Sequence, residues 1–290
     1  MLLRMSSARS AILLISCPDQ RGIVAAVTTF LAKHRGNILD LEQHTDAAEG
    51  VFFMRVEWDL AGFGVSVAAF AKAFGPVASR FDMTWELRPS SRPSRMAIFV
   101  TREAHCLYDI LARHQSGEWN VEIPLIVSNR ADLMHVAAQF KIPFHVIPIT
   151  PENKLEQERD TLSLLRKHRV DTVVLARYMQ ILSASFVAKL PHRIINIHHS
   201  FLPSFAGAKP YHAAHERGVK IIGATSHYVT EDLDKGPIIE QDIVRVSHRD
   251  SVEACIRKGK DVEKIVLSRA ITAHLAHRVL VYKNRTVVFG

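Results

Sequence analysis

The sequence predicts two domains, a small α+β sandwich followed by a larger α/β domain with a mostly parallel sheet. The chain of 290 residues is about twice as long as a typical single domain. Residues 89–95 contain two prolines and three serines between apolar-rich segments, a composition typical of a linker. Helical and strand periodicities alternate differently on the two sides of this linker. We therefore expect domains at residues 1–88 and 96–290.

The first domain is expected to begin with a strand over residues 10–17, preceded by a loose N-terminal tail. Asp19 is the predicted N-cap of the next helix, and Gly36 is the predicted left-handed residue at its end. The remaining elements are expected in the order strand, strand, helix and strand: residues 37–45, 50–58, 64–81 and 82–88. This is the split βαβ order of a ferredoxin-like sandwich.

The second domain is expected to be Rossmann-like, with helices on both faces of its sheet. Its predicted strands are short, apolar and poor in charge, as strands buried on both faces must be: residues 95–101, 121–129, 144–149, 171–176 and 193–197. A helix is predicted to open at Pro151, and a turn at Lys283 and Asn284 predicts a C-terminal hairpin. Ligands of such sheets bind beyond the carboxyl ends of the strands, which is where we expect the chemistry.

The bulk composition is that of an ordinary globular protein. The formal net charge is +8, but the basic residues are dispersed and form no nucleic-acid-binding motif, so we expect no nucleic-acid partner. A basic surface also attracts small anionic substrates. Cys17, Cys106 and Cys255 are scattered, which favours a reducing cytoplasm over a disulfide framework. We expect no membrane span, because no uncharged apolar run reaches about eighteen residues.

Polar side chains capable of catalysis gather between residues 195 and 242. Asn196 and His198 lie two apart at the end of a predicted strand, so their side chains leave on the same face and can bond one small polar group. An acidic turn at residues 231–236 follows. Its Asp232 or Asp234 carboxylate could act as a base, or could orient a water or the histidine.

These residues resemble the motifs of the folate-dependent formyltransferase fold. The resemblance rests on the strand end 196–198, the loop 200–203 and the turn 234–236, and it covers nearly all of residues 96–290. It implies that Asn196, His198 and Asp234 form the catalytic set. It further implies that residues 178–182 line the pterin pocket, although Gln180 stands where many transferases have Arg. The residues that we expect to bind or orient the substrate are Tyr178, Met179, Gln180, Ile181, Leu182, His199 and His227.

Within this fold, the whole chain resembles the formyltetrahydrofolate deformylases. The matching stretches are residues 17–22, 101–107, 196–205 and 261–270. The resemblance implies hydrolysis of 10-formyltetrahydrofolate to formate and tetrahydrofolate, in one-carbon and purine metabolism, without a cofactor. Water would attack the formyl carbon while Asn196 and His198 stabilise the oxyanion. Whether Asp234 is the direct base or orients His198 stays open.

Two other functions are compatible with the same residues. The first is transfer of the formyl group to an amine. Against it, the glycinamide ribonucleotide formyltransferases have a Gly- and Asn-rich phosphate loop where this chain has Thr101–Cys106, and Glu103 would repel a phosphate. Methionyl-tRNA formyltransferases carry an additional C-terminal β-barrel domain, and we expect none here, because the sequence ends at Gly290, too soon for one. The second alternative is a catalytically idle folate-binding regulator, which intact Asn196, His198 and Asp234 disfavour.

Several residues invite a metal or thiol hypothesis. Five histidines cluster in the sequence, but no ligand motif accompanies them, so we predict no metal: His198, His199, His212, His215 and His227. Cys106 follows His105 directly, and neighbouring residues of a helix or strand do not face each other. We therefore interpret Cys106 as a small buried side chain rather than a nucleophile.

The N-terminal domain resembles ACT modules, which bind small amino acids at domain interfaces. Residues Asp19, Gln20, Arg21 and Gly22 precede a helix, whose N-terminal amides can receive a carboxylate, and are the predicted regulatory site. Glycine and methionine are both logical effectors. The alternative is that this domain only mediates homo-oligomerisation, for which a tetramer is plausible.

Overall fold

The computed structural model describes residues 10–90, 92–203 and 210–290, so the tail expected before residue 10 lies outside it. The chain splits into two compact units. The N-terminal unit contains the residues up to Pro93 together with two C-terminal segments, His277–Leu280 and Val287–Gly290. The larger unit contains Ser94–Ala276 and Val281–Thr286. The last fourteen residues are therefore divided between the two units.

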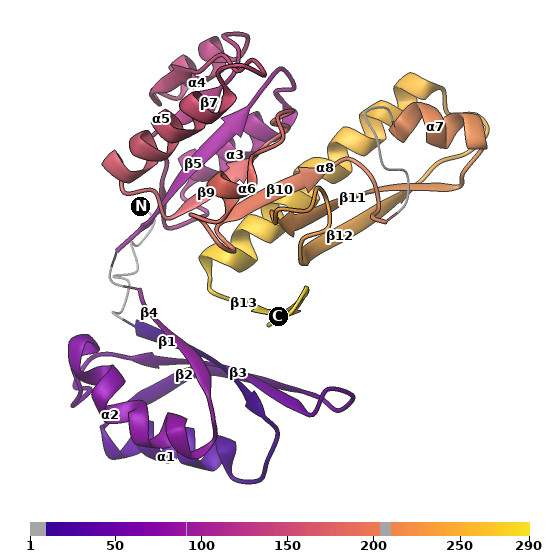
Figure 1. Cartoon of the computed structure of the whole chain (residues 1–290). Helices are drawn as coiled ribbons and strands as arrows, with labels where there is room; N and C mark the ends of the chain where they lie inside the picture. The colour runs from indigo at the N-terminus through magenta and orange to yellow at the C-terminus, as the bar shows by residue number, and fades with distance from the viewer. Residues whose placement is uncertain (1–9, 91, 204–209) are drawn as a thin grey trace. The chain divides into compact units, whose positions relative to one another are not determined.

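The N-terminal unit is a four-stranded antiparallel sheet with two helices (Figure 1). Its strand order, β2-β3-β1-β4, confirms the ferredoxin-like sandwich. The elements are β1 Ser10–Pro18, α1 Ile23–Lys33, β2 Asn37–Asp46, β3 Val51–Asp59, α2 Val67–Arg80 and β4 Thr84–Pro89. The predicted elements are all present, with ends that differ by a few residues.

Aromatic side chains form much of the core of this unit. The Trp58 and Phe70 rings stack with centroids 5.6 Å apart, and Phe74 stacks on Phe70 at 5.4 Å. Both phenylalanines face inward because they lie one turn apart on α2. That helix begins at Ser66, whose hydroxyl accepts a hydrogen bond from the Ala69 amide at 3.3 Å. The helix periodicity of the sequence thus reports a real amphipathic helix.

Two predicted helix ends were wrong. The N-cap of α1 is Gly22, in a left-handed conformation and without a side-chain hydrogen bond, so Asp19 does not cap the helix. The chain leaves β1 over four residues before the helix begins, which places Asp19 too far back. At the other end, the left-handed residue is Arg35, with φ 61°, rather than Gly36. Gly36 follows it and donates its N–H to the Leu31 carbonyl at 2.8 Å.

A buried arginine stabilises the sheet of the N-terminal unit. The Arg55 side chain is 3% exposed and pairs with Asp40 at 2.6 Å and Glu57 at 2.8 Å. Its Nε also donates to the His277 carbonyl at 3.2 Å. We expect Arg55→Ala to lower the free energy of unfolding of this unit by about 3 kcal/mol, because it leaves partly buried carboxylates unpaired. Hydrogen exchange of the β1–β4 amides measures this loss.

Arg88→Ala is the matched control. Arg88 lies on β4 and pairs with Glu86, but both side chains are about half exposed. Exposed pairs contribute about 0–1 kcal/mol, so this variant should exchange like the unmodified protein. Equal losses in the two variants would contradict a special role for Arg55.

The larger unit is built on a mixed sheet of order β12-β11-β10-β9-β5-β7-β8, with β6 paired to β5 (Figure 1). The strands from β10 to β8 are parallel, whereas β11 and β12 are antiparallel. This confirms the mostly parallel α/β fold. The strands are β5 Ser94–Val100, β6 Val121–Glu122, β7 Ile126–Ser128, β8 Phe144–Val146, β9 Thr172–Leu175, β10 Ile194–His198, β11 Ile221–Tyr228 and β12 Ile238–Arg245. Two further strands, β13 Val279–Tyr282 and β14 Arg285–Val288, form a separate sheet whose residues are divided between the two units. The helices are α3 His105–Ser116, α4 Met134–Gln139, α5 Lys154–Lys167, α6 Ala184–Val187, α7 Pro210–Arg217 and α8 Val252–Leu275.

Two predicted elements differ from the structure near prolines. The strand expected over residues 121–129 is divided into β6 and β7, because Pro124 has no N–H to donate to the sheet. The helix expected to open at Pro151 begins instead at Lys154. The Asn153 side chain accepts the Thr150 N–H at 2.8 Å, so residues 150–153 form a turn before the helix.

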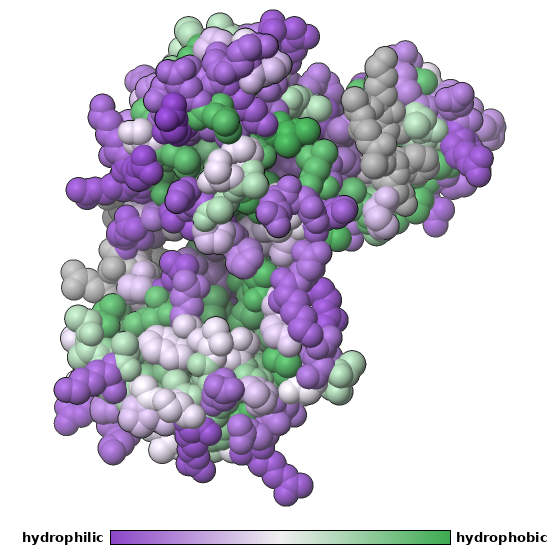
Figure 2. Space-filling model, in the orientation of Figure 1, coloured by the Kyte–Doolittle hydropathy of each residue, from purple (hydrophilic) through white to green (hydrophobic). Residues whose placement is uncertain are grey.

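The long helix α8 packs along the antiparallel strands and against α3 and α7. After it, β13 and β14 pair as the predicted hairpin, with Lys283 at φ 54° in its turn. In Figure 2, hydrophilic side chains cover the outer helices of the larger unit, and apolar side chains show between them. Among the described residues, no helix is long and apolar enough to cross a membrane.

Candidate active site

A tight acidic turn joins β11 to β12 and carries Asp234. Asp234 has φ 55°, a left-handed value that non-glycine residues seldom adopt. A Cβ atom on Gly236 would lie 1.7 Å from the Tyr228 carbonyl oxygen, so only glycine fits there. The Tyr228 N–H donates to the Pro237 carbonyl at 2.9 Å and closes the turn.

The Asp234 carboxylate meets two histidines from neighbouring strands. It lies 3.2 Å from His198 Nδ1 and 3.5 Å from His227 Nε2. Antiparallel pairing of β10 and β11 places Asn196 opposite His227, and their side-chain nitrogens are 3.2 Å apart. The structure therefore brings together Asn196, His198 and Asp234, which the sequence assigned to one catalytic set, and adds His227 to them.

Hydrogen bonds control the charge of this group. The hydrogen bond from His198, and to a smaller extent that from His227, holds the pKa of the Asp234 carboxyl well below its ordinary value. Partial burial acts in the opposite direction. His227 Nδ1 donates to the Tyr228 carbonyl at 2.9 Å, which fixes the orientation of that ring. Asp234 is consequently an anion throughout the neutral pH range.

One nitrogen of His198 is available for chemistry. The side chain is buried, its Nδ1 faces Asp234, and its Nε2 has no hydrogen-bond partner within the part of the chain that the structure describes. A histidine held at Nδ1 by a carboxylate can accept or give a proton at Nε2. This arrangement fits general acid–base catalysis beside the Asn196 amide.

No sequence motif marked the polar residues that support this group. Thr225 is fully buried on β11, and its hydroxyl donates to the Ser200 carbonyl at 3.0 Å. The same oxygen accepts the Leu202 N–H at 3.0 Å and the Gln241 amide at 2.9 Å. Thr225 thus holds the loop that follows His198. Only the pairing of β10, β11 and β12 makes its role visible.

Comparisons with known proteins were consistent with one another. Residues 94–271 match the family model described as formyl transferase, and residues 11–57 match the ACT domain. The formyltetrahydrofolate deformylase of Synechocystis is 56% identical over 97% of this chain and 99% of its own. That of Escherichia coli K12 is 43% identical over 98% of this chain and all of its own. The chain belongs to the formyltetrahydrofolate deformylase family.

Solved structures separate this deformylase family from its transferase relatives. A formyltetrahydrofolate deformylase from Pseudomonas syringae superposes with a TM-score of 0.95 at 49% identity, covering 99% of this chain and 97% of its own. A glycinamide ribonucleotide transformylase from Symbiobacterium toebii gives 0.65 at 27% identity, covering 71% of this chain and 98% of its own. The deformylase match thus spans both units of this chain, whereas the transformylase match leaves more than a quarter of it uncovered.

The segment expected to line the pterin pocket of this deformylase family member follows β9. Tyr178 is buried, with its ring edge-on to Phe99 at 5.3 Å, so it belongs at least partly to the core. Met179 and Ile181 are more than half exposed. The Met179 N–H donates to the Thr101 hydroxyl at 3.1 Å, which ties the segment to the end of β5. Gln180 and Leu182 are half-buried.

In the described chain, no hydrogen bond or ion pair joins residues 178–182 to Asn196, His198 or Asp234. The remaining predicted substrate residue, His199, lies beside His198 with ring centroids 5.2 Å apart. The structure therefore groups the two histidines directly and leaves the 178–182 segment as a separate side of the site.

The predicted regulatory residues of the N-terminal unit are exposed. Asp19, Gln20, Arg21 and Gly22 form the connection between β1 and α1. The Asp19 N–H donates to the Gly50 carbonyl at 2.8 Å. Gly22, at the start of α1, has φ 93°, and no side chain caps the first amides of that helix.

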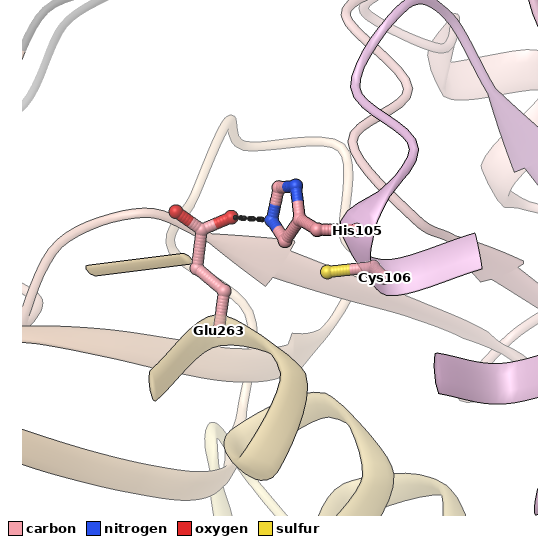
Figure 3. Close-up of side chains that lie close together, drawn as sticks. All are labelled: His105, Cys106 and Glu263. Atoms are coloured by element: carbon pink, nitrogen blue, oxygen red, sulfur yellow. Dashed lines mark hydrogen bonds and ion pairs between the residues drawn. The ribbon is translucent and has the colours of Figure 1, made fainter. Parts of the chain in front are cut away.

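A second buried polar cluster lies around Glu263 of α8, and the sequence analysis missed it (Figure 3). Glu263 is 1% exposed and accepts hydrogen bonds from His105 Nε2 at 2.8 Å and Tyr211 Oη at 2.5 Å. Arg177 Nε is 3.5 Å away. These partners are distant in sequence, and only the folded sheet brings them together.

The ligand atoms of His105, Cys106 and Glu263 lie within 4.8 Å of one another, the only such group among the described residues. However, the guanidinium of Arg177 already lies beside the carboxylate, which disfavours a cation. Of the histidines considered for zinc, His212 and His215 are exposed on α7.

Cys106 is fully buried, and burial, followed by the nearby Glu263 charge, raises the pKa of its thiol well above the ordinary value. We expect Cys106 to be unreactive toward a disulfide reagent at pH 8 in the native protein. Titration in the absence and presence of denaturant, with a Cys106→Ala variant as reference, measures this. Rapid native modification at Cys106 would contradict the expectation.

Proposed function

We propose that this protein hydrolyses 10-formyltetrahydrofolate to formate and tetrahydrofolate. The observation that carries the proposal is the Asp234–His198 pair beside Asn196. His198 Nε2 has no hydrogen-bond partner among the described residues. The near full-length identity to formyltetrahydrofolate deformylases supports the same reaction. The reaction belongs to one-carbon and purine metabolism.

His198 acts as the base and Asp234 orients it. Asp234 is a weak base, because its hydrogen bonds hold its pKa below the ordinary value. Its carboxylate accepts a hydrogen bond from the Nδ1–H of His198 instead, and so leaves Nε2 to take a proton from water. Of the two roles that the sequence leaves open for Asp234, the geometry favours orientation.

The remaining steps follow from the chemistry of a formamide. The water oxygen bonds to the formyl carbon, and the Asn196 amide donates a hydrogen bond to the developing oxyanion. One such donor contributes about 3–4 kcal/mol to the lowering of the barrier. The tetrahedral intermediate collapses as the carbon–nitrogen bond breaks, and the protonated His198 gives its proton to the folate nitrogen. The products are formate and tetrahydrofolate, and no metal or cofactor takes part.

Water is the proposed acceptor, because the described loop after β5 is not built to bind an anionic amine. The loop after β5, Thr101–Cys106, has no glycine that would let backbone amides surround a phosphate. Its Glu103 carboxylate forms an ion pair with Lys260 at 2.5 Å, which lowers its pKa and keeps it charged. Transfer to an amine is the alternative that this loop disfavours.

The N-terminal unit is proposed to bind a small amino acid and regulate turnover. ACT domains match residues 11–57, and the exposed residues 19–22 precede a helix N-terminus without a side-chain cap. Oligomerisation alone is the competing role for this unit. We further propose that the protein is cytoplasmic, which the three free, buried cysteines support, and that it forms a homo-oligomer.

The test is formate release from the purified protein and 10-formyltetrahydrofolate with no amine present. Stoichiometric formate and tetrahydrofolate are expected. Release that requires a particular amine would make the protein a transferase. Tight binding of unchanged 10-formyltetrahydrofolate over hours would make it a folate-binding regulator.

A further inference from the structure

A single buried carboxylate joins three segments of the larger unit. Glu263 lies in the middle of α8 and is 1% exposed. His105, at the start of α3, donates to it at 2.8 Å. Tyr211 of α7 donates at 2.5 Å, and Arg177, which follows β9, lies at 3.5 Å. Figure 3 shows Glu263 and His105 pointing toward each other from their helices.

The charge of Glu263 is maintained despite this burial. Burial raises the pKa of the carboxyl, but the His105 hydrogen bond and the Arg177 charge outweigh it and hold the pKa below its ordinary value. Buried charged groups of this kind contribute little net stability compared with apolar residues of the same size. A role in fixing geometry is therefore the better explanation for Glu263.

The shape of α8 is adapted to the tyrosine. A Cβ atom on Gly259 would lie 2.2 Å from Tyr211 Cζ, so the ring occupies the space that a side chain at position 259 would fill. Gly259 is one turn before Glu263, which lets the hydroxyl of the same ring reach the carboxylate. The phenol is thus held on its ring face by the helix backbone and at its hydroxyl by Glu263.

The tyrosine ring continues to the catalytic histidines. Tyr211 meets His199 edge-on, with ring centroids 6.2 Å apart. His199 in turn lies 5.2 Å from His198, whose Nδ1 faces Asp234. Glu263 is therefore connected to His198, the proposed base, through the packed rings of Tyr211 and His199. We call this connection the tyrosine arm.

A second connection, the arginine arm, joins Glu263 through Arg177 to the 178–182 segment. Arg177 has φ 63°, a left-handed value, directly before the 178–182 segment, in which Met179 and Ile181 are exposed. Its guanidinium is mostly buried beside Glu263. The ion pair fixes the residue at which the chain turns into that segment, so Glu263 also controls where the segment begins.

We propose that Glu263 is a positioning residue that holds His199 through Tyr211 and the 178–182 segment through Arg177. The proposal rests on the proposed function, in which His198 is the base. The tyrosine arm and the arginine arm are expected to affect different kinetic constants. Loss of the tyrosine arm misplaces the histidines and lowers kcat, whereas loss of the arginine arm releases the segment expected to contact the pterin and raises KM.

The experiment compares four variants in the formate-release assay. Tyr211→Phe keeps the ring and should lower kcat about tenfold with KM within about twofold. Arg177→Gln should raise KM about tenfold with kcat within about threefold. Glu263→Gln should show both effects. Asp261→Asn is the control, because Asp261 lies on the same helix in an exposed pair with Lys264 and should leave both constants unchanged.

Active-site titration and circular dichroism separate geometry from folding. If Glu263→Gln and Tyr211→Phe reduce only the folded fraction, and the remaining sites keep both constants, Glu263 is merely structural and the proposal is overturned. Stoichiometric zinc in the purified protein that is absent from Glu263→Gln also overturns it, because Glu263 would then be a metal ligand.

The positioning role of Glu263 can be tested even if the protein does not hydrolyse 10-formyltetrahydrofolate. A folded unmodified protein that releases no formate contradicts hydrolysis, but not the two arms. In that case, the imidazole resonances of His199 should move in Tyr211→Phe, and the affinity for tetrahydrofolate should fall about tenfold in Arg177→Gln. Unchanged resonances and unchanged affinity would overturn the positioning role independently.

Discussion

Asp234→Asn is expected to lower kcat for formate release by about 10²–10⁴-fold and to change KM little. The amide keeps the size of the side chain but cannot stabilise a protonated His198, from which the carboxylate lies 3.2 Å. An amide can also present its N–H₂ group to Nδ1 and so turn the ring away from its working orientation. Steady-state formate release, together with the dissociation constant for tetrahydrofolate, measures both parts of the expectation.

Asp232→Asn is the matched control on the same turn. The Asp232 side chain is 68% exposed and lies near Lys235, whereas Asp234 is 25% exposed and faces two histidines. We expect normal turnover in this variant. A kcat for Asp234→Asn within threefold of the unmodified value would remove Asp234 from the proposed mechanism, and a loss confined to Asp232→Asn would exchange the two roles.

Asp234→Asn should also change how the stability of the protein depends on pH. The pKa of Asp234 is lower in the folded state than the value of about 4 for an unfolded aspartate. Its contribution to stability is therefore present above about pH 4 and is lost as the pH falls toward the folded pKa. Thermal unfolding at pH 5 and pH 3 should show a smaller acid loss for Asp234→Asn than for the unmodified chain.

Gly236→Ala is expected to abolish measurable formate release and to destabilise the β11–β12 turn. A methyl group at this position would lie 1.7 Å from the Tyr228 carbonyl oxygen, which is backbone and cannot move aside. The turn would have to open, and Asp234 would move away from both histidines. We expect a loss of about 2–4 kcal/mol in unfolding free energy, in the range of severe backbone strain. Denaturant unfolding and the formate assay test this together.

Gly117→Ala distinguishes a collision from ordinary backbone strain. Gly117 follows α3 with φ 77°, and nothing lies within 4 Å of a Cβ built there. Alanine should therefore cost about 1–2 kcal/mol and leave kcat unchanged. If Gly236→Ala retained normal turnover, the tight turn would not be what places Asp234.

The sequence predicted those parts of the site that depend on local spacing. Asn196 and His198 share a strand, and the period of a strand is enough to put them on one face. The acidic turn was visible as well, because β-prone runs flank it. Choosing Asp234 over Asp232 depended on a family resemblance, since the left-handed conformation of Asp234 leaves no sign in the residue type.

Long-range contacts were beyond sequence reasoning. The register of β10 on β11 brings His227 to Asn196, and nothing in either segment specifies that pairing. The Glu263 cluster draws on residues 105, 177, 211 and 263, each unremarkable in its own segment. Asp19 was a reasonable N-cap by residue type, but the connection to α1 is longer than the pattern suggests.

The division of the last fourteen residues between the two units affects the order in which the chain can fold during synthesis. Strands β1 to β4 are synthesised before the larger unit. The hydrogen bonds from Arg55 to the His277 carbonyl and from the Gly290 N–H to Glu42 can form only after the larger unit has been made. The N-terminal unit therefore remains incomplete until residues 277–290 emerge. A ribosome stalled before residues 277–290 have been made would carry an N-terminal unit that lacks both contacts.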